Sequence, residues 1–397
     1  MPVRVTPLVG LGATIAVAIA VAAVLAVTGW RAEHFRDGDF IQYWVAGRAL
    51  LSGADVYDPL TWRALHDAIG SGGYEIAPGL GFLYPLPVAL YALPIALLPL
   101  QLAGPLWFVA EGATAFGALV AIGRQVFTWA PRRDLPLLLV LAVVMVPVYV
   151  IGNDGNIARF LVGIVGGALA LLIGGRTFAA GLVLGLAGVK PQLFVVLVPL
   201  LVVVCPPQTR GRFVAGGLTT ILASLVVTVA LRPGWIAEWL TQALQARGGY
   251  GRLNVWAVFV GGTTWIAVVL LVCALSGLVW WWRATRPSID RSASAALGLS
   301  LIFAPYASDY DLAVLLVGVP AVLATVAPFP PPWRAALIVV LVATSPVLTV
   351  FAAFGLLDQA VLFVPPVALT ALVVGTQLLA ARAGLAGSAS LDPDPPD

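Results

Sequence analysis

Residues 177–204 read TFAAGLVLGLAGVKPQLFVVLVPLLVVV, an apolar stretch that contains one charged residue. About 20 apolar residues cross a bilayer as a helix, so this stretch is too long for a single span. The pair Lys190-Pro191 interrupts it, because proline removes a helical hydrogen bond and clashes with the preceding turn. We therefore expect two short helices that meet at Lys190.

The composition of the whole chain repeats this pattern. Hydrophobic residues make up 61% of the 397 positions and charged residues 10%, which is far outside the range of soluble domains. The apolar runs are continuous rather than alternating, so they predict helices and not a barrel. We expect an all-α, polytopic transmembrane bundle of about twelve spans. The apolar runs lie at about 7–30, 103–123, 134–151, 157–174, 177–204, 213–231, 257–281, 294–305, 311–327, 333–352 and 360–381.

Positive charge orients these spans. With both termini in the cytoplasm, twelve arginines fall at short cytoplasmic turns or ends, as the positive-inside rule requires. Four prolines interrupt the apolar segment 82–101, and threading it as a full span would place Arg132 and Arg133 outside. We therefore interpret it as re-entrant. The arginines assigned to the inside are Arg4, Arg124, Arg132, Arg133, Arg176, Arg210, Arg212, Arg283, Arg286, Arg291, Arg334 and Arg382.

This topology predicts one domain over residues 1–385 in the cell membrane, followed by a disordered acidic tail at 386–397. The polar segments all face outward. They are the first outer loop at 31–102, the turn at 152–156, Lys190, the loop at 232–256 and the turn at 308–311. Of the acidic residues that we placed, only Glu111 falls inside a span, and we assign it no role.

The first outer loop contains two expected amphipathic helices, at about 39–51 and 59–69, which we place on the membrane surface. Asp39 opens the first, with Tyr43 one turn later on the same face. Asp58-Pro59 has the form of an N-cap followed by a first-turn proline, so Asp58 is expected to be structural. Asp39 is either a helix cap or a functional carboxylate.

Several motifs occur in a fixed order between about residues 37 and 315. DFIQYWVAGRALLSGADVYDP (39–59) is followed by LYPLPVALYALPIALLP (83–99), a GN-rich turn, GLVLGLAGVKP (181–191) and PYASDYDL (305–312). In this order they resemble glycosyltransferase family 87. The resemblance implies a GT-C-type membrane enzyme that takes a sugar, typically mannose, from a polyprenyl-phosphate carrier outside the cytoplasmic membrane. It also implies that Asp39, at the family's motif position, is the catalytic base.

The chemistry of such a reaction suits one carboxylate. Polyprenyl phosphate is a good leaving group, so it needs electrostatic stabilisation but no general acid. One base that deprotonates the acceptor hydroxyl, on the face opposite the phosphate, gives inversion. Asp37 is the alternative base. No clustered carboxylate-histidine site accompanies Asp39, so we expect neither an obligatory metal nor a cofactor.

Other residues are assigned to substrate binding. Lys190 would meet the phosphate, although a lysine at a membrane surface also extends to the interface for its own hydration. A polar turn explains the residues at 309–311 equally well. Asn156 either lines the same cavity or caps the helix that begins near Ile157, and capping is the better explanation. The full set of assigned substrate-binding residues is Tyr43, Arg48, Tyr84, Asn156, Lys190, Arg247, Asp309, Tyr310 and Asp311.

The predicted partners are membrane lipid, a polyprenyl-phosphate sugar donor and a glycolipid or glycan acceptor. Nucleic acid is not expected, because the net charge is only +3 and no basic cluster with aromatic residues occurs. Nothing in the sequence indicates an oligomer. The main alternative is a transporter or lipid flippase, for which ionisable groups should lie near the membrane centre. A third possibility is a GT-C-like scaffold without the chemistry.

Overall fold

The structure is a computed structural model that describes residues 38–71, 79–126, 155–246, 255–259, 261–326 and 364–382. Every regular element in these ranges is helical, and they contain no strand. The all-α prediction is therefore confirmed for this part of the chain. Some predicted features lie outside the described residues, namely the spans at 7–30, 134–151 and 333–352 and the tail at 386–397.

Three described helices are long and apolar enough to cross a membrane: α6 (Leu100–Val126), α11 (Pro207–Leu231) and α14 (Thr264–Thr285). Other apolar segments form shorter helices, so the count of about twelve spans stays a prediction. The shorter helices of the bundle are α8 (Ala158–Ile173), α9 (Thr177–Gly185), α10 (Leu197–Val204), α15 (Ile289–Ile302), α16 (Val319–Val326) and α18 (Val364–Arg382).

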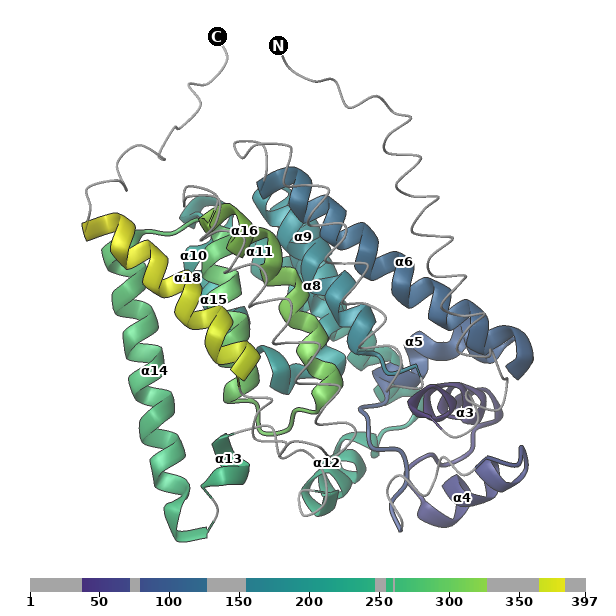
Figure 1. Ribbon diagram of the computed structural model, residues 1–397. Helices are drawn as coiled ribbons and strands as arrows, with labels where there is room; N and C mark the ends of the chain where they lie inside the picture. The colour runs from purple at the N-terminus through teal and green to yellow at the C-terminus, as the bar shows by residue number, and fades with distance from the viewer. Residues whose placement is uncertain are drawn as a thin grey trace, which may run out of the picture.

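The bundle has two packed halves (Figure 1). In one half, α6 packs on α8, α8 on α9, and α9 on α11. In the other, α15 packs on α10 and α18. The 3₁₀ helix η7 (Asp309–Gly318) contacts both α8 and α15, so it joins the two halves. Its first residues therefore lie where the two halves meet.

The chain breaks at Lys190, as predicted. Helix α9 tightens into the 3₁₀ helix η3 (Leu186–Val189), and a second 3₁₀ helix, η4 (Pro191–Phe194), follows. Lys190 lies between them with φ −135° and ψ 64°, which is not helical. The break leaves the Lys190 side chain at a fixed point between two rigid segments.

Glycines bring α9 and α11 into close contact. A Cβ atom on Gly181 would overlap the carbonyl oxygen of Phe213, and one on Gly185 would lie 2.7 Å from Thr220 Cβ. We expect Gly181→Val to destabilise the protein by at least about 3 kcal/mol, because backbone atoms cannot yield as side chains can. Thermal unfolding in detergent measures this. Gly277→Val on α14 is the control, since a Cβ there meets no described atom within 4 Å, and an equal loss in both variants would contradict the prediction.

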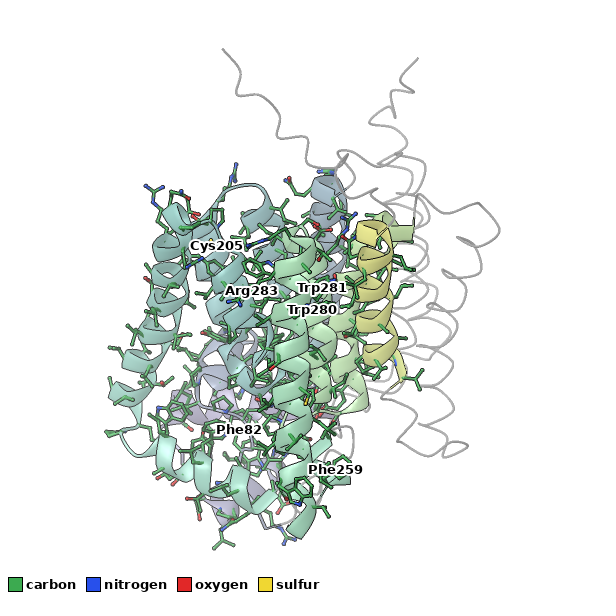
Figure 2. The ribbon with its side chains drawn as sticks, turned by 90° about the vertical axis from the view of Figure 1, so that its left-hand side faces the viewer. Phe82, Cys205, Phe259, Trp280, Trp281 and Arg283 are labelled. Carbon is green, nitrogen blue, oxygen red and sulfur yellow. The ribbon has the colours of Figure 1, made fainter. Side chains whose placement is uncertain are left out.

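One end of the bundle, at the bottom of Figure 1, carries α12 (Trp235–Gln245) and the segment that the sequence predicts as the first outer loop. The loop contains α3 (Asp39–Ser52), α4 (Pro59–Asp67) and α5 (Pro87–Ala96). The short helix α13 (Val255–Val258) lies at the same end (Figure 1). Figure 2 places Phe82 and Phe259 toward this end, and Cys205 and Arg283 toward the other. Segments that the sequence assigns to the outer face thus gather together.

Helices α3 and α4 lie where they are expected, but α3 is not amphipathic. Nine of its residues, on all sides of the helix, are buried. Helix α4 buries only Trp62 and His66, and its other residues are half-buried or exposed. The prediction of an amphipathic α3 is therefore wrong, because α5 packs against α3 and covers it. That either helix lies along a membrane surface stays a prediction.

Helix α5 bears on the re-entrant interpretation of residues 82–101. It has 10 residues, which span about 15 Å, half of a ~30 Å hydrocarbon core. Leu97 ends it, and α6 begins at Leu100. A segment this short does not cross a bilayer, so its geometry favours the re-entrant interpretation over a full span.

His66 gives the end of the bundle around α4 a predicted pH dependence. Its side chain is buried between Trp62, 4.6 Å away between ring centroids, and Ser71, whose hydroxyl lies 3.1 Å from Nδ1. Burial lowers the pKa of His66 from 6.5 to about 4. The unfolded chain therefore binds a proton more readily, and stability is fully present above pH 6.5 and lost as the pH falls toward 4. The loss of stability reaches about 3 kcal/mol. When unfolding is followed from neutral to acidic pH, we expect His66→Phe to lose much less stability than the wild type.

Candidate active site

Asp39 begins α3 and lies half-buried at the end of the bundle that carries α12. Its neighbour Gly38 takes the N-cap position and offers no side chain to cap the helix. The free N–H groups of a helix N-terminus stabilise negative charge, so this position suits a carboxylate. Asn156 donates from Nδ2 to Asp39 Oδ2 at 2.6 Å. A residue 117 positions away in the chain therefore holds the carboxylate.

Asn156 is fixed on both sides of its amide. Its Oδ1 accepts from the backbone N–H of Ala158 at 2.9 Å and from Lys190 Nζ at 3.3 Å. Because these two donors require an oxygen, the amide nitrogen must point toward Asp39 and toward the hydroxyl of Tyr84, 3.3 Å away. The Asn156 side chain thus accepts from the first N–H of α8 and also orients Asp39.

Lys190 is buried in an ion pair. Its Nζ lies 2.8 Å from Asp311 Oδ1, and the two side chains are 2% and 0% exposed. The rings of Tyr84 and Tyr310 lie 5.7 Å and 4.6 Å from Nζ, within the range of cation–π attraction. Asp311 is itself held, because its Oδ2 accepts from the backbone N–H of Ser308 at 2.9 Å. Lys190 therefore ties together the break at 190, the turn before α8 and the start of η7.

Two tyrosines complete this polar cluster. Tyr43 is fully buried, and its hydroxyl accepts from the backbone N–H of Ile157 at 3.4 Å. Its ring contacts that of Tyr84 edge-on at 5.1 Å. Tyr84 is half-buried and sits beside Asn156. Of the residues assigned from sequence, the structure brings together Asp39, Tyr43, Tyr84, Asn156, Lys190, Tyr310 and Asp311.

Arg48 lies elsewhere. Its Nε donates to the carbonyl oxygen of Ala96 at 3.1 Å, and its guanidinium stacks on Trp44 at 4.5 Å. It therefore binds the C-terminal end of α5 rather than the cluster around Asp39. Arg247 and the alternative base Asp37 lie outside the described residues, and for Asp309 the structure describes the backbone only. Their roles stay predictions.

Contacts from α12 and the residue before it hold the segment that contains α3, α4 and α5. Arg232, just before α12, pairs with Asp55 and with Glu238, whose Oε2 lies 2.8 Å from Nε. Trp239 donates from its indole to the carbonyl oxygen of Leu83 at 3.0 Å. This hydrogen bond ties α12 to the residue before Tyr84.

Some residues of the site are not evident from sequence. Tyr306 accepts a hydrogen bond from Ser308 Oγ at 3.4 Å beside the start of η7, although only its neighbours were assigned roles. Trp107 contacts the turn that carries Asn156, since its indole donates to Gly155 O at 2.9 Å. Arg159 pairs with Glu111 at 3.2 Å. The sequence does give a signal for Arg159, which is a charge within an apolar run. A tryptophan in such a run gives no comparable signal of a role in the site.

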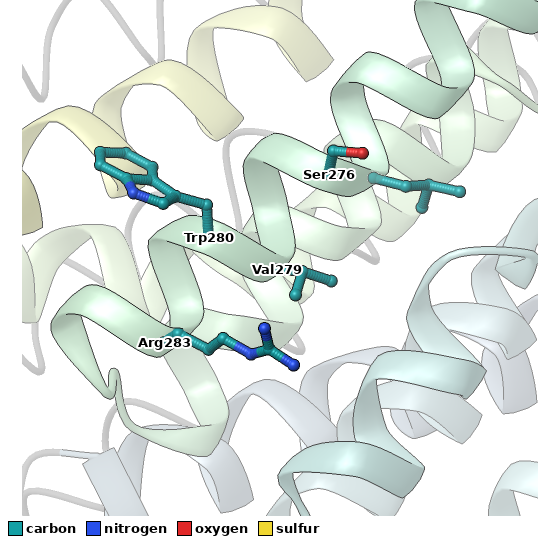
Figure 3. Close-up of a pocket in the computed structure, with 5 residues that line it drawn as sticks. Ser276, Val279, Trp280 and Arg283 are labelled. Atoms are coloured by element: carbon teal, nitrogen blue, oxygen red, sulfur yellow. The ribbon is translucent and has the colours of Figure 1, made fainter.

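A surface groove on α14 is separate from this cluster. Its lining residues, Leu275, Ser276, Val279, Trp280 and Arg283, all come from one helix (Figure 3). Figure 2 shows Trp280 and Arg283 far along the bundle from Phe82, which lies two residues before Tyr84. Because one helix face lines it, the groove does not enclose a substrate.

A comparison with protein-family models matches residues 82–305 to glycosyltransferase family 87, which is more than half of the chain. The chain belongs to glycosyltransferase family 87. Its membership makes the protein a membrane glycosyltransferase and favours an enzyme over a transporter. No curated protein and no solved structure matches the chain.

The family match includes some residues of the cluster and not others. It covers Tyr84, Asn156 and Lys190, but it begins after Asp39 and ends before Asp311. The hydrogen bonds from Asn156 to Asp39 and from Lys190 to Asp311 join these outlying carboxylates to the matched part. Within the described ranges, no three His, Cys, Asp or Glu side chains come together as a metal site, and metal-independent transfer stays a prediction.

Proposed function

We propose that this family 87 enzyme transfers a hexose, most simply mannose, from a polyprenyl-phosphate carrier to a lipid-linked or glycan acceptor. The reaction takes place at the outer face of the cell membrane. The observation that carries the proposal is the position of Asp39, which stands at a helix N-terminus and is held by Asn156 at 2.6 Å. The same asparagine contacts a buried cation, Lys190.

In the proposed reaction the Asp39 carboxylate takes the proton of the acceptor hydroxyl. The acceptor oxygen forms a bond to the anomeric carbon from the face opposite the phosphate. The bond from this carbon to the phosphate oxygen breaks, and its electron pair leaves with polyprenyl phosphate. One displacement inverts the anomeric configuration, and no second carboxylate is needed because the leaving group is already a stable anion.

A phosphate carrier also suits the charges of the cluster. Lys190 is held between Asp311 and Asn156, so a phosphate oxygen would share this ammonium with Asp311 rather than find it unpaired. Tyr84 and Tyr310 stand beside Lys190, and Tyr84 is also beside Asn156, where hydroxyl groups of a sugar would meet phenol oxygens and ring faces. A long apolar carrier is compatible with a site built among membrane helices.

The arrangement of segments supports the proposed outer location. The segments that hydropathy and charge predict to face outward, around Asp39, Lys190 and η7, meet at one cluster. A donor that is anchored in lipid reaches such a site by diffusion within the membrane. Placing this end outside gives the cluster access to acceptors of the cell envelope.

Transfer by the purified protein tests this proposal. We expect radiolabelled polyprenyl-phosphate mannose to label a glycolipid or glycan acceptor extract, whereas a labelled nucleotide sugar gives no product. The anomeric configuration of the new linkage should be opposite to that of the donor. Labelling from the nucleotide sugar would overturn the proposed donor class. Absence of product, together with carrier-lipid movement in proteoliposomes, would favour a flippase.

A further inference from the structure

Helix α6 packs closely against the turn that carries Asn156. Gly155 takes φ +84°, and its carbonyl oxygen accepts from Trp107 Nε1 at 2.9 Å. A Cβ on Gly155 would lie 2.6 Å from Phe40 Cβ and 3.4 Å from Trp107 Cδ1. The turn is therefore enclosed between α3 and α6, and only glycine fits the space and the positive φ.

One turn further along α6, a buried ion pair holds the other side of the same turn. Glu111 Oε2 lies 3.2 Å from Arg159 Nη1, and the side chains are 0% and 5% exposed. Arg159 belongs to the first turn of α8, three residues after Asn156. Its guanidinium also lies 5.1 Å from the ring of Phe108. The contacts of Trp107 and Glu111 thus bracket Asn156 from one helix.

Charges inside a membrane bundle are costly to bury, and this pair has no place in the proposed proton transfer. A role in stability alone would not require charges, because well-packed apolar residues often replace a buried ion pair without loss. A positioning role does use them, since an indole N–H fixes a distance and an angle, and an ion pair holds two groups at contact distance, more closely than apolar packing does. The site supplies a reason for such a constraint. Asn156 must present its amide to Asp39 at 2.6 Å, and a misplacement of about 1 Å costs on the order of 100-fold in rate.

We propose that Trp107 and the Glu111–Arg159 pair are positioning residues, which fix the Gly155–Asn156 turn and through it the carboxylate of Asp39. The proposal rests on the proposed function, because Asp39 is the base there. In the proposed reaction, none of the three positioning residues contacts the acceptor or the donor. Their loss should therefore lower turnover and leave donor binding nearly unchanged.

Trp107→Phe tests the indole bond. The ring of Trp107 stacks on Tyr43 at 5.5 Å between centroids, and phenylalanine keeps an aromatic ring there while removing the N–H. We expect kcat to fall by about 10- to 100-fold and the KM for polyprenyl-phosphate mannose to change less than about twofold. Trp44→Phe is the matched control, since Trp44 Nε1 donates instead to the carbonyl oxygen of Leu98 at 3.1 Å, and its kcat should stay within about twofold.

Glu111→Met/Arg159→Met separates positioning from stability. We expect the double variant to unfold close to the wild-type temperature, because it removes both charges of the pair. We also expect its kcat to be lower than that of the wild type. The single change Arg159→Met should lower both the unfolding temperature and kcat, since Glu111 then stays buried without its cation. A double variant with wild-type kcat would overturn the proposal, as it would show that packing suffices.

Hydrogen exchange makes the test independent of sugar transfer. The amides of Ile157 and Ala158 donate to Tyr43 and to Asn156 Oδ1, so they report whether the turn is held. In Trp107→Phe and in the double variant we expect these amides to exchange at least about 10-fold faster, with the middle of α8 unchanged. Unchanged exchange would overturn the proposal. If the wild type transfers no sugar while exchange still rises, the proposed function fails and the positioning of the turn stands.

Discussion

Asp39→Asn is expected to lower sugar transfer by at least about 100-fold while the protein unfolds at the wild-type temperature. The change removes the proton acceptor and keeps the shape of the side chain. Its amide oxygen still accepts from Asn156 Nδ2, which lies 2.6 Å from Asp39 Oδ2 in the native protein. The geometry of the cluster is therefore retained, and only the chemistry is lost. Initial rates with polyprenyl-phosphate mannose and thermal unfolding in detergent measure the two quantities.

Asp58→Asn is the matched control for this experiment. Asp58 caps α4, where its Oδ2 accepts from the backbone N–H of Thr61 at 2.8 Å. Asparagine caps a helix about as well as aspartate, so both the transfer rate and the unfolding temperature should stay near wild type. Full activity of Asp39→Asn, with loss in Asp37→Asn, would move the base to Asp37. Equal losses in Asp39→Asn and Asp58→Asn would show that the assay responds to the loop as a whole.

Lys190→Met is expected to destabilise the protein by about 3–5 kcal/mol, because it leaves the Asp311 carboxylate buried without its cation. The side chains of this pair are 2% and 0% exposed, so water cannot replace the lost partner. Denaturant unfolding in detergent measures the loss. Arg63→Met is the matched control. Arg63 pairs with Asp67 at 3.6 Å on the exposed face of α4, and its loss should leave stability nearly unchanged.

The double variant Lys190→Met/Asp311→Asn separates two roles of Lys190. It removes both charges of the buried pair, so it should regain a large part of the lost stability. If Lys190 serves only to hold the elements together, transfer returns with stability. If it also binds the donor phosphate, as proposed, transfer stays low and the KM for the donor rises. A stable double variant with the wild-type KM would exclude phosphate binding by Lys190.

The sequence predicts the parts of this molecule that depend on local physics. The break at Lys190-Pro191 is visible because a proline follows a charge within an apolar run. The start of α4 at Pro59, with Asp58 as its cap, follows from first-turn preferences. Such features need no knowledge of distant residues.

The features that the sequence does not predict depend on distant contacts. Arg48 lies in the same motif as Asp39 and Tyr43, yet it turns toward the carbonyl oxygen of Ala96 because α5 folds back against α3. Asn156 cannot be assigned to Asp39 from sequence, since 117 positions separate them. The polar cluster is therefore recognisable by residue type, whereas its hydrogen bonds are set by how the bundle closes.

The long separation of the cluster residues also has a consequence for biosynthesis. Asp39 lies near the start of the chain and Asp311 far toward its end. At about 5–20 residues per second, roughly 15 to 55 s of translation separate the two. During that time a nascent chain already contains Asp39, the proposed base, but lacks Lys190, η7 or both. A chain that stalls before η7 is made therefore cannot assemble the polar cluster around Asp39 and Lys190.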